Sequence, residues 1–548
     1  MSRRLSPIIL LLLFQLSLIF SLVLFNISDA VPESKINQKI SFGSGVMLQA
    51  FYWDTPSDWY TIVTEQIPEI KNAGFDAIWL PPPSKGHSGG YSMGYDPYDY
   101  YDLGEFFQHG TTPTRFGTKI ELLALTTEAH NYELAVVGDI VLNHNSGGAS
   151  EWNPNINDYT WTDFTGLQSG KFLRSYNDFH PSSYEEADEG IFGGFPDLCH
   201  ANPYVHDELI KWGQWLRDEI GFDSWRFDYV KGFHASMVQD WMTSVGGWGV
   251  AEYWDGYLPA VLQYLDDTNN VVSGFDFPLY YILQDLCNSD GTYDMGNLAN
   301  SDYRGVMGTR PFQSVTFVAN HDTNEIAINK MMAYAFILTA EGYPCVFWND
   351  WVDPNFKEKI NTLILIHNQF AKGGTDILYT NDDLYVAQRN GDPGCLVVLN
   401  DGSDWSGVTV QTKWSNTLLK DLTGQAFDEE TDSEGNVEVW APPKGYTVFA
   451  PGELEETTFT TVINSTTSST SISTTSPSSY PTSTESTFTE TSNPSTSLST
   501  TPEVTKTPTT TSIRTTSATA RFQFPLLIML CGLTGYLLQQ SLKRNQRK

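Results

Sequence analysis

Cysteine is scarce in this chain of 548 residues. The five cysteines stand far apart, at Cys199, Cys287, Cys345, Cys395 and Cys531. A disulfide framework needs more cysteines at closer spacing, so one or two bridges are the most that this sequence allows. Folded domains must therefore depend on packing, and a content of 40% apolar residues is enough for a large core and more than one domain.

Positive charge is also in short supply. Lys and Arg number 31 against 65 Asp and Glu, which gives a formal charge of -34 and a pI near 4.5. No nucleic acid partner is expected, because neutralising phosphates needs clustered basic side chains. The 16 Trp and 27 Tyr exceed what packing needs and favour a sugar substrate, although an aromatic-rich core is the alternative.

Apolar residues are few in 457–520, where Thr, Ser and Pro dominate. Such a segment cannot offset the entropy of ordering and is typical of a glycosylated stalk, and Asn464 begins a glycosylation sequon. Long apolar runs occur instead at the two ends of the chain. Residues 1–30 have the pattern of a signal peptide, with an uncleaved anchor as the alternative.

Residues 524–538 are apolar and a basic tail follows, so the run extended to 542 predicts a C-terminal transmembrane anchor at 524–542. Together the two ends indicate a secreted protein held at the cell surface, with the membrane as a partner of this anchor. We expect the globular head between them to be monomeric.

The head alternates short β-branched or aromatic runs with longer amphipathic patterns such as 59–73 and 204–220. We predict eight strands, at 46–50, 77–80, 135–141, 224–228, 249–252, 271–275, 315–319 and 343–347. Eight such units predict an α/β fold, a (β/α)8 TIM barrel made of residues 41–143 and 203–371.

Two further regions are expected around the barrel. The connection 144–202 is too long for a simple loop and predicts an inserted loop domain after strand 3. Beyond residue 371, short strands are broken by turns at 390–393 and 400–402, which predicts a C-terminal antiparallel β-sandwich domain at 372–452.

Polar side chains gather where four of the predicted strands end. In a barrel of this kind, function lies at the carboxyl ends of the strands. A single Asp at such a point is commonly a helix cap, but four converging strands indicate an active site. Asp228 and Glu252 follow neighbouring strands and could act as the nucleophile and the proton donor of a retaining glycoside hydrolase.

These segments, 138–144, 221–228, 250–254 and 319–322, together with the loop 94–98, resemble the conserved regions of the α-amylase family, glycoside hydrolase family 13. The resemblance covers nearly the whole head. Segments 80–86, 225–232 and 317–323 are most similar to archaeal α-amylases.

The resemblance implies a role for each matching side chain. Asp228 corresponds to the nucleophile, Glu252 to the acid and base, and Asp322 to the carboxylate that binds the distorted sugar. The residues matched to substrate binding are Tyr95, His144, Arg226, Lys231, Trp254 and His321. Strand alternation also puts Arg226 on the same face as Asp228, where it would keep the nucleophile ionised.

The resemblance also implies calcium between the inserted segment and the barrel. The matching ligands are Asn143, Asp188, Asp197 and the carbonyls of Gly190 and Gly232, although Asp and Gly in a loop are otherwise ordinary turn residues.

Some archaeal relatives bind zinc through two His and one Cys in this segment. Here His180 and Cys199 match, and Glu185 replaces the second His. A carboxylate can bind zinc, and the alternative is that Cys199 is a small buried residue without a metal.

The implied activity is that of a retaining α-amylase, a glycoside hydrolase that cleaves internal α-1,4-glucosidic bonds of starch, glycogen or maltodextrins. A transglycosylase or debranching enzyme of the same family is the first alternative. A catalytically inactive glucan-binding or accessory protein is the second, and the presence of all three carboxylates disfavours it.

Overall fold

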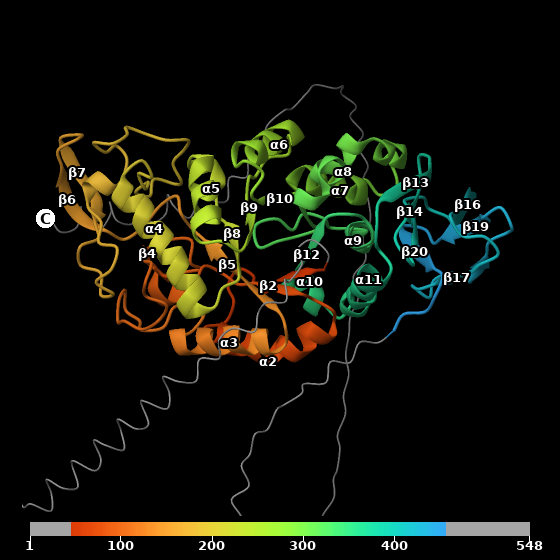
Figure 1. Ribbon diagram of the computed structural model, residues 1–548, viewed down its shortest axis with the longest axis horizontal. Helices are drawn as coiled ribbons and strands as arrows, with labels where there is room; N and C mark the ends of the chain where they lie inside the picture. The colour runs from red at the N-terminus through yellow and green to blue at the C-terminus, as the bar shows by residue number, and fades with distance from the viewer. Residues whose placement is uncertain (1–44, 456–548) are drawn as a thin grey trace, which may run out of the picture. The chain divides into compact units, whose positions relative to one another are not determined.

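The computed structural model describes residues 45–455, and its centre is a closed barrel of eight parallel strands (Figure 1). In chain order the barrel strands are β1 (Met47–Gln49), β2 (Ala77–Trp79), β5 (Ala135–Ile140), β8 (Ser224–Phe227), β9 (Trp248–Ala251), β10 (Ser273–Phe275), β11 (Ser314–Phe317) and β12 (Tyr343–Phe347). The last strand pairs with the first, which closes the barrel. The predicted (β/α)8 fold is confirmed, and each predicted strand overlaps an observed one.

The barrel strands are buried along nearly their whole length. Every residue of β2, β5, β8 and β12 is buried, because helices cover the outside and side chains fill the inside. Apart from Ser and Thr, the buried polar side chains of the barrel strands are Gln49 in β1, Asp139 in β5 and Arg226 in β8. Buried polar groups need partners, and these three lead to the site described below.

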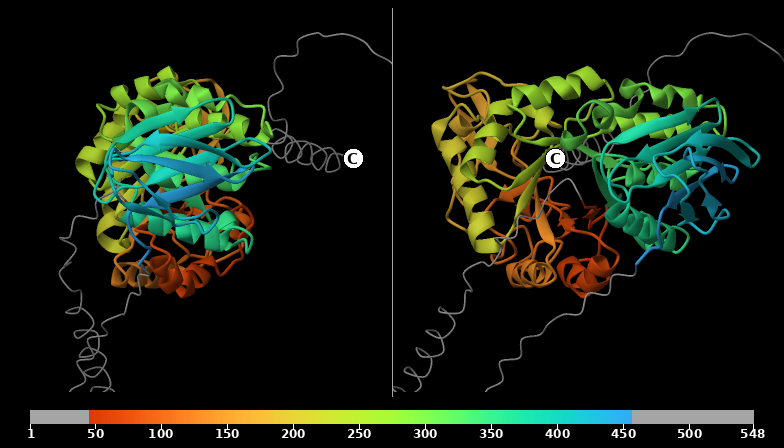
Figure 2. Two further views of the ribbon diagram at one scale, coloured as in Figure 1. Left: turned by 90° about the vertical axis from the view of Figure 1, so that its right-hand side faces the viewer. Right: turned by 45° about the vertical axis from the view of Figure 1, so that its right-hand side comes forward.

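The helices surround the barrel (Figures 1 and 2). They are α2 (Trp59–Asn72), α3 (Lys119–Asn131), α4 (Pro203–Trp215), α5 (Ala235–Ser244), α6 (Leu258–Asp267), α7 (Phe277–Asn288), α8 (Gly305–Thr309), α9 (Lys330–Thr339), α10 (Trp348–Val352) and α11 (Lys357–Gln369). In α2 the buried residues Val63, Ile67 and Ile70 recur every three or four positions, so one stripe of the helix packs on the barrel.

Short antiparallel strand pairs extend from two of the connections. β3 (Lys85–Gly86) pairs with β4 (Pro97–Asp99) before α3. The hairpin of β6 (Ala149–Asn153) and β7 (Asp158–Asp163) lies in the long segment between β5 and α4. Figure 1 shows this hairpin on the far side of the barrel from the C-terminal strands. The bounds 144–202 of an inserted domain stay a prediction.

The C-terminal part is antiparallel, as predicted (Figure 2). A six-stranded sheet has the order β13 (Thr375–Thr380), β14 (Leu384–Arg389), β15 (Leu396–Asn400), β20 (Gly445–Ala450), β17 (Leu418–Asp421) and β18 (Glu429–Glu430). A second sheet pairs β16 (Ser406–Gln411) with β19 (Asn436–Ala441). Val398, Val439 and Phe449 belong to a hydrophobic core shared by the two sheets.

The membrane prediction is corrected by the structure. Within residues 45–455 no helix is long and apolar enough to cross a bilayer. Helix α2, for example, has 14 residues, whereas a span needs about 20. This finding is against the C-terminal anchor as a membrane partner and against the predicted cell-surface location. The segments assigned to the signal peptide, the stalk and the anchor lie outside the described residues.

Candidate active site

Two carboxylates follow directly on neighbouring barrel strands. Strands β8 and β9 pair in parallel, with Phe227 opposite Ala251, so Asp228 and Glu252 leave the barrel at the same level. The amide N–H of Asp228 donates to the carbonyl of Ile140, and that of Glu252 to the carbonyl of Phe227, both at 3.0 Å. The strand ladder therefore fixes both backbones at the carboxyl end of the barrel.

Arg226 binds both of these carboxylates from inside the barrel. Its Nη1 donates to Asp228 Oδ1 at 2.8 Å and to Asp139 Oδ1 at 2.8 Å, and its Nη2 lies 2.6 Å from Glu252 Oε1. The guanidinium is 1% exposed. Contacts to two nitrogens of one guanidinium are compatible with the roughly 5 Å separation of the carboxyl groups in retaining glycosidases.

Three buried carboxylates, those of Asp139, Asp228 and Glu252, share the single positive charge of Arg226. Burial raises the pKa of Asp228 well above its usual range, and the nearby charge of Glu252 adds to the rise, although Arg226 opposes it. Burial likewise raises the pKa of Glu252, again against the effect of Arg226. One positive charge cannot balance all of these buried groups, so both pKa values are shifted upward.

The third carboxylate, Asp322, has a different environment. Its Oδ1 accepts a hydrogen bond from Trp53 Nε1 at 3.2 Å, and its Oδ2 lies 3.1 Å from His321 Nε2. Burial alone would raise the pKa of Asp322, but His321, Arg226 and Trp53 together lower it. The pKa of Asp322 is therefore shifted downward, opposite to the shifts of Asp228 and Glu252, which favours the ionised form of Asp322.

The imidazole of His321 is oriented by a residue of the first barrel strand. Gln49 Nε2 lies 2.9 Å from His321 Nδ1. An amide nitrogen only donates, so Nδ1 accepts from Gln49 and Nε2 is the nitrogen that faces Asp322. The ring of Tyr95 stacks on His321 with 5.3 Å between centroids and 5° between planes.

Tyr95 joins several of these groups. Its hydroxyl donates to Asp139 Oδ2 at 2.8 Å, and its carbonyl lies 3.0 Å from His144 Nε2. Burial lowers the pKa of His144 to about 4, so this ring is neutral at neutral pH. The predicted residues Tyr95, His144, Arg226 and His321 are therefore brought together with the carboxylates.

Lys231 and Trp254 lie at the edge of this group and have other partners. Lys231 Nζ lies 2.7 Å from Asp255 Oδ2. Trp254 donates from Nε1 to the hydroxyl of Tyr281 at 2.9 Å, and its ring stacks on Phe277. Neither has a described contact with the three carboxylates.

Sequence analysis missed four residues of the site, namely Gln49, Trp53, Trp79 and Asp139. Asp139 accepts from Arg226, from Tyr95 and from Trp79 Nε1, the last at 3.1 Å. A polar residue inside an otherwise apolar strand was the available signal for Gln49 and Asp139. Trp53 and Trp79 had none, because their partners are distant in sequence.

Several predicted calcium ligands converge beside this site. His180 Nδ1 lies 3.0 Å from Asp197 Oδ2 and 3.8 Å from Asp188 Oδ1, and these three groups are close enough to hold one ion. His200, which sequence analysis missed, has Nδ1 3.6 Å from Asp188 Oδ2. Although burial opposes it, contacts with Asp197, Cys199 and Asp188 raise the pKa of His180 to about 10. These surroundings favour a cation.

The residues present fit a hard cation. Asn143 Oδ1, Asp188 Oδ1 and Asp197 Oδ1 are buried and have no hydrogen-bond donor among the described residues. A Cβ at Gly232 would stand 1.9 Å from Asn143 Oδ1, so glycine leaves this oxygen room. The carbonyl of Gly232 accepts from the N–H of Gly190 at 3.2 Å. This hydrogen bond brings together the two glycines whose carbonyls are predicted calcium ligands.

The predicted zinc ligands also lie near one another. His180 Nε2 is 3.5 Å from Glu185 Oε2, and Cys199 belongs to the same group of possible ligands. Cys199 is buried, and its sulfur lies 3.1 Å from the hydroxyl of Ser182. His180 therefore faces the predicted calcium ligands Asp188 and Asp197 through Nδ1 and the predicted zinc ligand Glu185 through Nε2.

Comparison with known proteins adds independent findings. Residues 54–276 match the family model described as alpha amylase, catalytic domain, and residues 395–450 match the model described as alpha-amylase C-terminal. An alpha-amylase from Bacillus licheniformis is 31% identical over 71% of this chain and 88% of its own length. A glucan 1,4-alpha-maltohexaosidase from Bacillus sp. (strain 707) is 30% identical over 72% of this chain and 90% of its own.

A crystal structure of an alpha-amylase from Geobacillus thermoleovorans, complexed with acarbose, has the same fold. Its TM-score is 0.60 at 21% identity, over 74% of this chain and 98% of that one. These relatives are bacterial, so they do not show the special likeness to archaeal members that the sequence segments suggested.

Proposed function

The chain belongs to the α-amylase family, and we propose that it is a retaining α-amylase that hydrolyses internal α-1,4-glucosidic bonds of starch, glycogen or maltodextrins. One observation carries the proposal, namely that Arg226 contacts both Asp228 and Glu252 at the carboxyl ends of adjacent strands. In such a pair, one side chain can attack the anomeric carbon and the other can protonate the leaving oxygen.

In the first step, Glu252 gives its proton to the glycosidic oxygen as the bond from that oxygen to C1 breaks. A carboxylate oxygen of Asp228 forms a new bond to C1, which gives a covalent glycosyl-enzyme. Burial raises the pKa of both carboxyl groups and Arg226 contacts both of them, so the pair is suited to share one proton. The assignment of that proton to Glu252, with Asp228 as the nucleophile, follows the match to the family's conserved segments.

In the second step, Glu252, now ionised, takes a proton from water as the water oxygen attacks C1. The bond to Asp228 breaks and leaves Asp228 as a carboxylate. Each step inverts C1, so the product keeps the α configuration. Asp322, kept ionised beside His321, would bind hydroxyls of the distorted sugar and favour its partial positive charge.

The remaining predicted residues are proposed to bind sugar. Tyr95 would provide a stacking surface, and His144 and His321 would contact the sugar at the cleavage point. Lys231 and Trp254 would bind the chain on the leaving-group side. An archaeal-type form of these loops, suggested by residues 80–86, 225–232 and 317–323, is part of the same proposal, and a phylogeny with archaeal and bacterial members would test it.

Calcium is the proposed structural ion. Asn143, Asp188, Asp197 and the carbonyls of Gly190 and Gly232 would hold it, and the oxygens without donors support this choice. When bound, the ion would brace the segment after β5 against the barrel. Zinc at His180, Glu185 and Cys199 is proposed as a second ion, supported by their proximity.

The test is NMR of the first products released from soluble starch by the full chain. We expect α-anomeric products from the wild type. Asp228→Asn should lower kcat by roughly 10⁴-fold or more, because it removes the nucleophile. The matched control Asp240→Asn, a change at an exposed carboxylate on α5, should act like the wild type. Products of β configuration, or an active Asp228→Asn variant, would refute the mechanism.

A further inference from the structure

The backbone of Tyr229, the residue after the proposed nucleophile Asp228, has an uncommon conformation. Its φ is 43° and its ψ is 49°, which places it in the left-handed region. Gly, Asn and Asp favour this region, whereas a bulky side chain such as that of Tyr rarely adopts it. Such strain persists only where the surrounding structure holds it, and it is common at functional sites. No step of the proposed reaction accounts for it.

The surrounding structure holds this conformation from two sides. The carbonyl of Tyr229 accepts from the N–H of Gly232 at 3.0 Å, next to the short 3₁₀ helix η4 (Val230–Gly232). The ring of Tyr229 packs against Phe192 with 5.0 Å between centroids and 65° between planes, and its hydroxyl donates to the carbonyl of Ile191 at 3.4 Å. The segment between β5 and α4 therefore holds the ring, and η4 holds the carbonyl.

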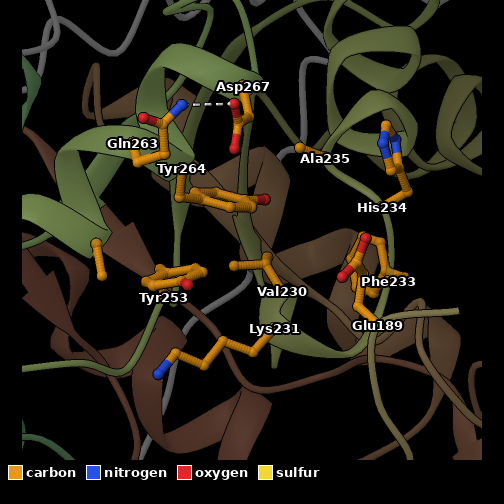
Figure 3. Close-up of a pocket in the computed structure, with 11 residues that line it drawn as sticks. Glu189, Val230, Lys231, Phe233, His234, Ala235, Tyr253, Gln263, Tyr264 and Asp267 are labelled. Carbon is orange, nitrogen blue, oxygen red and sulfur yellow. Dashed lines mark hydrogen bonds between the residues drawn. The ribbon is translucent and has the colours of Figure 1, made fainter.

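The chain that follows Tyr229 is packed as well. Val230 is 1% exposed, and Val230 and Lys231 line a cavity of about 620 Å³ (Figure 3). Tyr253, which follows Glu252 directly, lines the same cavity. The segments after both carboxylates thus reach one cavity wall. A different backbone conformation at Tyr229 would displace Val230 and Lys231 from this wall.

The N–H of Tyr229 faces the proposed acid and base. It donates to Glu252 Oε2 at 2.9 Å. The other oxygen, Oε1, lies 2.6 Å from Arg226 Nη2, so each carboxyl oxygen of Glu252 faces a nitrogen donor. Because η4 fixes the chain beyond Tyr229, the angle φ of Tyr229 sets the plane of the peptide bond that carries this N–H. The left-handed conformation is therefore what keeps the hydrogen bond to Glu252 in place.

This hydrogen bond also acts on the protonation of Glu252. Burial raises the pKa of Glu252 and the charge of Asp322 adds to the rise, whereas Arg226, the N–H of Tyr229 and His321 lower it. A backbone N–H can only donate, so it favours the ionised form of the carboxyl group. Glu252 is in that form when it acts as the base of the proposed second step. The charged and titratable groups that face it are Arg226, Asp228, Asp322 and His321.

We propose that Tyr229 is a positioning residue, whose left-handed backbone directs its N–H at Glu252 and so fixes the orientation of the acid and base. The inference rests on the proposed α-glucan hydrolysis. It gives the role to the backbone of Tyr229, while the side chain only helps to hold that backbone. Activity should therefore follow how well the residue at this position adopts the left-handed region.

The test replaces Tyr229 by Asn and by Val in the full chain, with soluble starch as the substrate. Both variants lose the ring and its contact with Phe192, but Asn tolerates the left-handed region and β-branched Val does not. Tyr229→Asn should keep kcat within about fivefold of the wild type. Tyr229→Val should lower kcat about 10-fold to 100-fold with little change in KM, the usual effect of one lost hydrogen bond to a charged group.

The pH dependence of kcat/KM gives a second readout. Without the N–H of Tyr229, one of the effects that lower the pKa of Glu252 is lost and this pKa rises. Glu252 then keeps its proton to higher pH, so the basic limb of the profile should move to higher pH in Tyr229→Val. Tyr229→Asn should keep the limb of the wild type.

Matched controls come from Glu133, an exposed residue with a φ of 54° just before the amino end of β5. Glu133→Val should unfold at a lower temperature than Glu133→Asn, and both should keep the kcat and the pH profile of the wild type.

Equal losses of kcat in Tyr229→Asn and Tyr229→Val would overturn the inference, because the side chain would then be responsible. So would an unmoved basic limb in Tyr229→Val. Tyr229→Gly reaches the left-handed region without strain, so a loss of activity in this variant would overturn the inference even if Tyr229→Val fails to fold. A wild type that cleaves no α-glucan would instead refute the proposed function itself.

Discussion

At the scale of single residues, the site depends on how Arg226 is shared. The guanidinium contacts Asp139, Asp228 and Glu252 through two of its nitrogens. A lysine carries the same charge but cannot contact three carboxylates in one plane. The substitution Arg226→Lys would therefore keep the positive charge and remove the oriented contacts, which separates the two effects.

Arg226→Lys should lower kcat by roughly 10²-fold, because the nucleophile and the acid lose their common support. The guanidinium lowers the pKa of Asp228 against the effect of burial. With a weaker contact that pKa rises, Asp228 becomes protonated at higher pH, and the acidic limb of the kcat/KM profile should move to higher pH. The control Arg310→Lys, at an exposed pair with Asp266, should leave the profile unchanged. An unmoved acidic limb in Arg226→Lys would contradict this account.

The sequence alone was sufficient for the residues that end strands. Asp228 and Glu252 are one step beyond β8 and β9, so their convergence follows from strand order. The contacts of Trp53 with Asp322 and of Gln49 with His321 join residues 269 and 272 positions apart. Such pairings depend on side-chain packing, which local patterns do not encode.

At the scale of elements, the segment between β5 and α4 gathers two acidic side chains around one of its own histidines. Asp188 and Asp197 share His180, and each has an oxygen without a donor among the described residues. Without a cation these buried oxygens would make the folded segment less stable. The stability of the segment should therefore depend on a divalent ion.

Removing the ion with a chelator should lower the unfolding temperature of the full chain by roughly 5 °C or more, and added Ca²⁺ should restore it. Asp197→Asn should abolish this response, whereas Asp240→Asn should retain it. Calorimetry with and without chelator makes the measurement. The same unfolding temperature under both conditions would show that these residues hold no ion.

Elements differ in how well the sequence predicted them. The barrel strands were found because both of their faces are buried, which gives short apolar runs between helical patterns. The pair β3 and β4 was missed, since strands of two and three residues lack a readable period. Strand ends were also extended too far, as in β11, which ends at Phe317 rather than 319.

At the scale of the whole molecule, the barrel and the C-terminal sheets are tied together near α11. Arg389 of β14 donates to the carbonyl of Thr339 in α9 at 2.8 Å. His367 of α11 is 4% exposed, and its Nδ1 lies 3.1 Å from the carbonyl of Leu338. Burial, helped by Lys372 and Arg389, lowers the pKa of His367 to about 3.

This buried histidine should make the protein less stable in acid. Between pH 6.5 and about 3 the unfolded chain binds a proton at His367 and the folded chain does not. Unfolding thus takes up a proton, and its free energy should fall by on the order of 3 kcal/mol between pH 7 and 4. Denaturant titrations should show a shallower pH dependence for His367→Gln than for the wild type. The partly exposed control His206→Gln should match the wild type, and equal slopes in all three would contradict the prediction.

The overall architecture was readable because a (β/α)8 barrel repeats one unit along the chain, and the repeat of strand and helix patterns survives local errors. The antiparallel C-terminal part was indicated by its turns. The membrane anchor was inferred from apolar composition alone, and no described helix supports it.

The pairing of β1 with β12, and of Gln49 with His321, has a consequence for synthesis on the ribosome. His321 is oriented by a residue made near the start of the chain, and the barrel closes only when Tyr343–Phe347 has emerged. A nascent chain that already contains Asp228 and Glu252 still lacks an assembled site. The enzyme therefore becomes active late in its own translation, and fragments that end before β12 should not degrade glucan inside the cell that makes them.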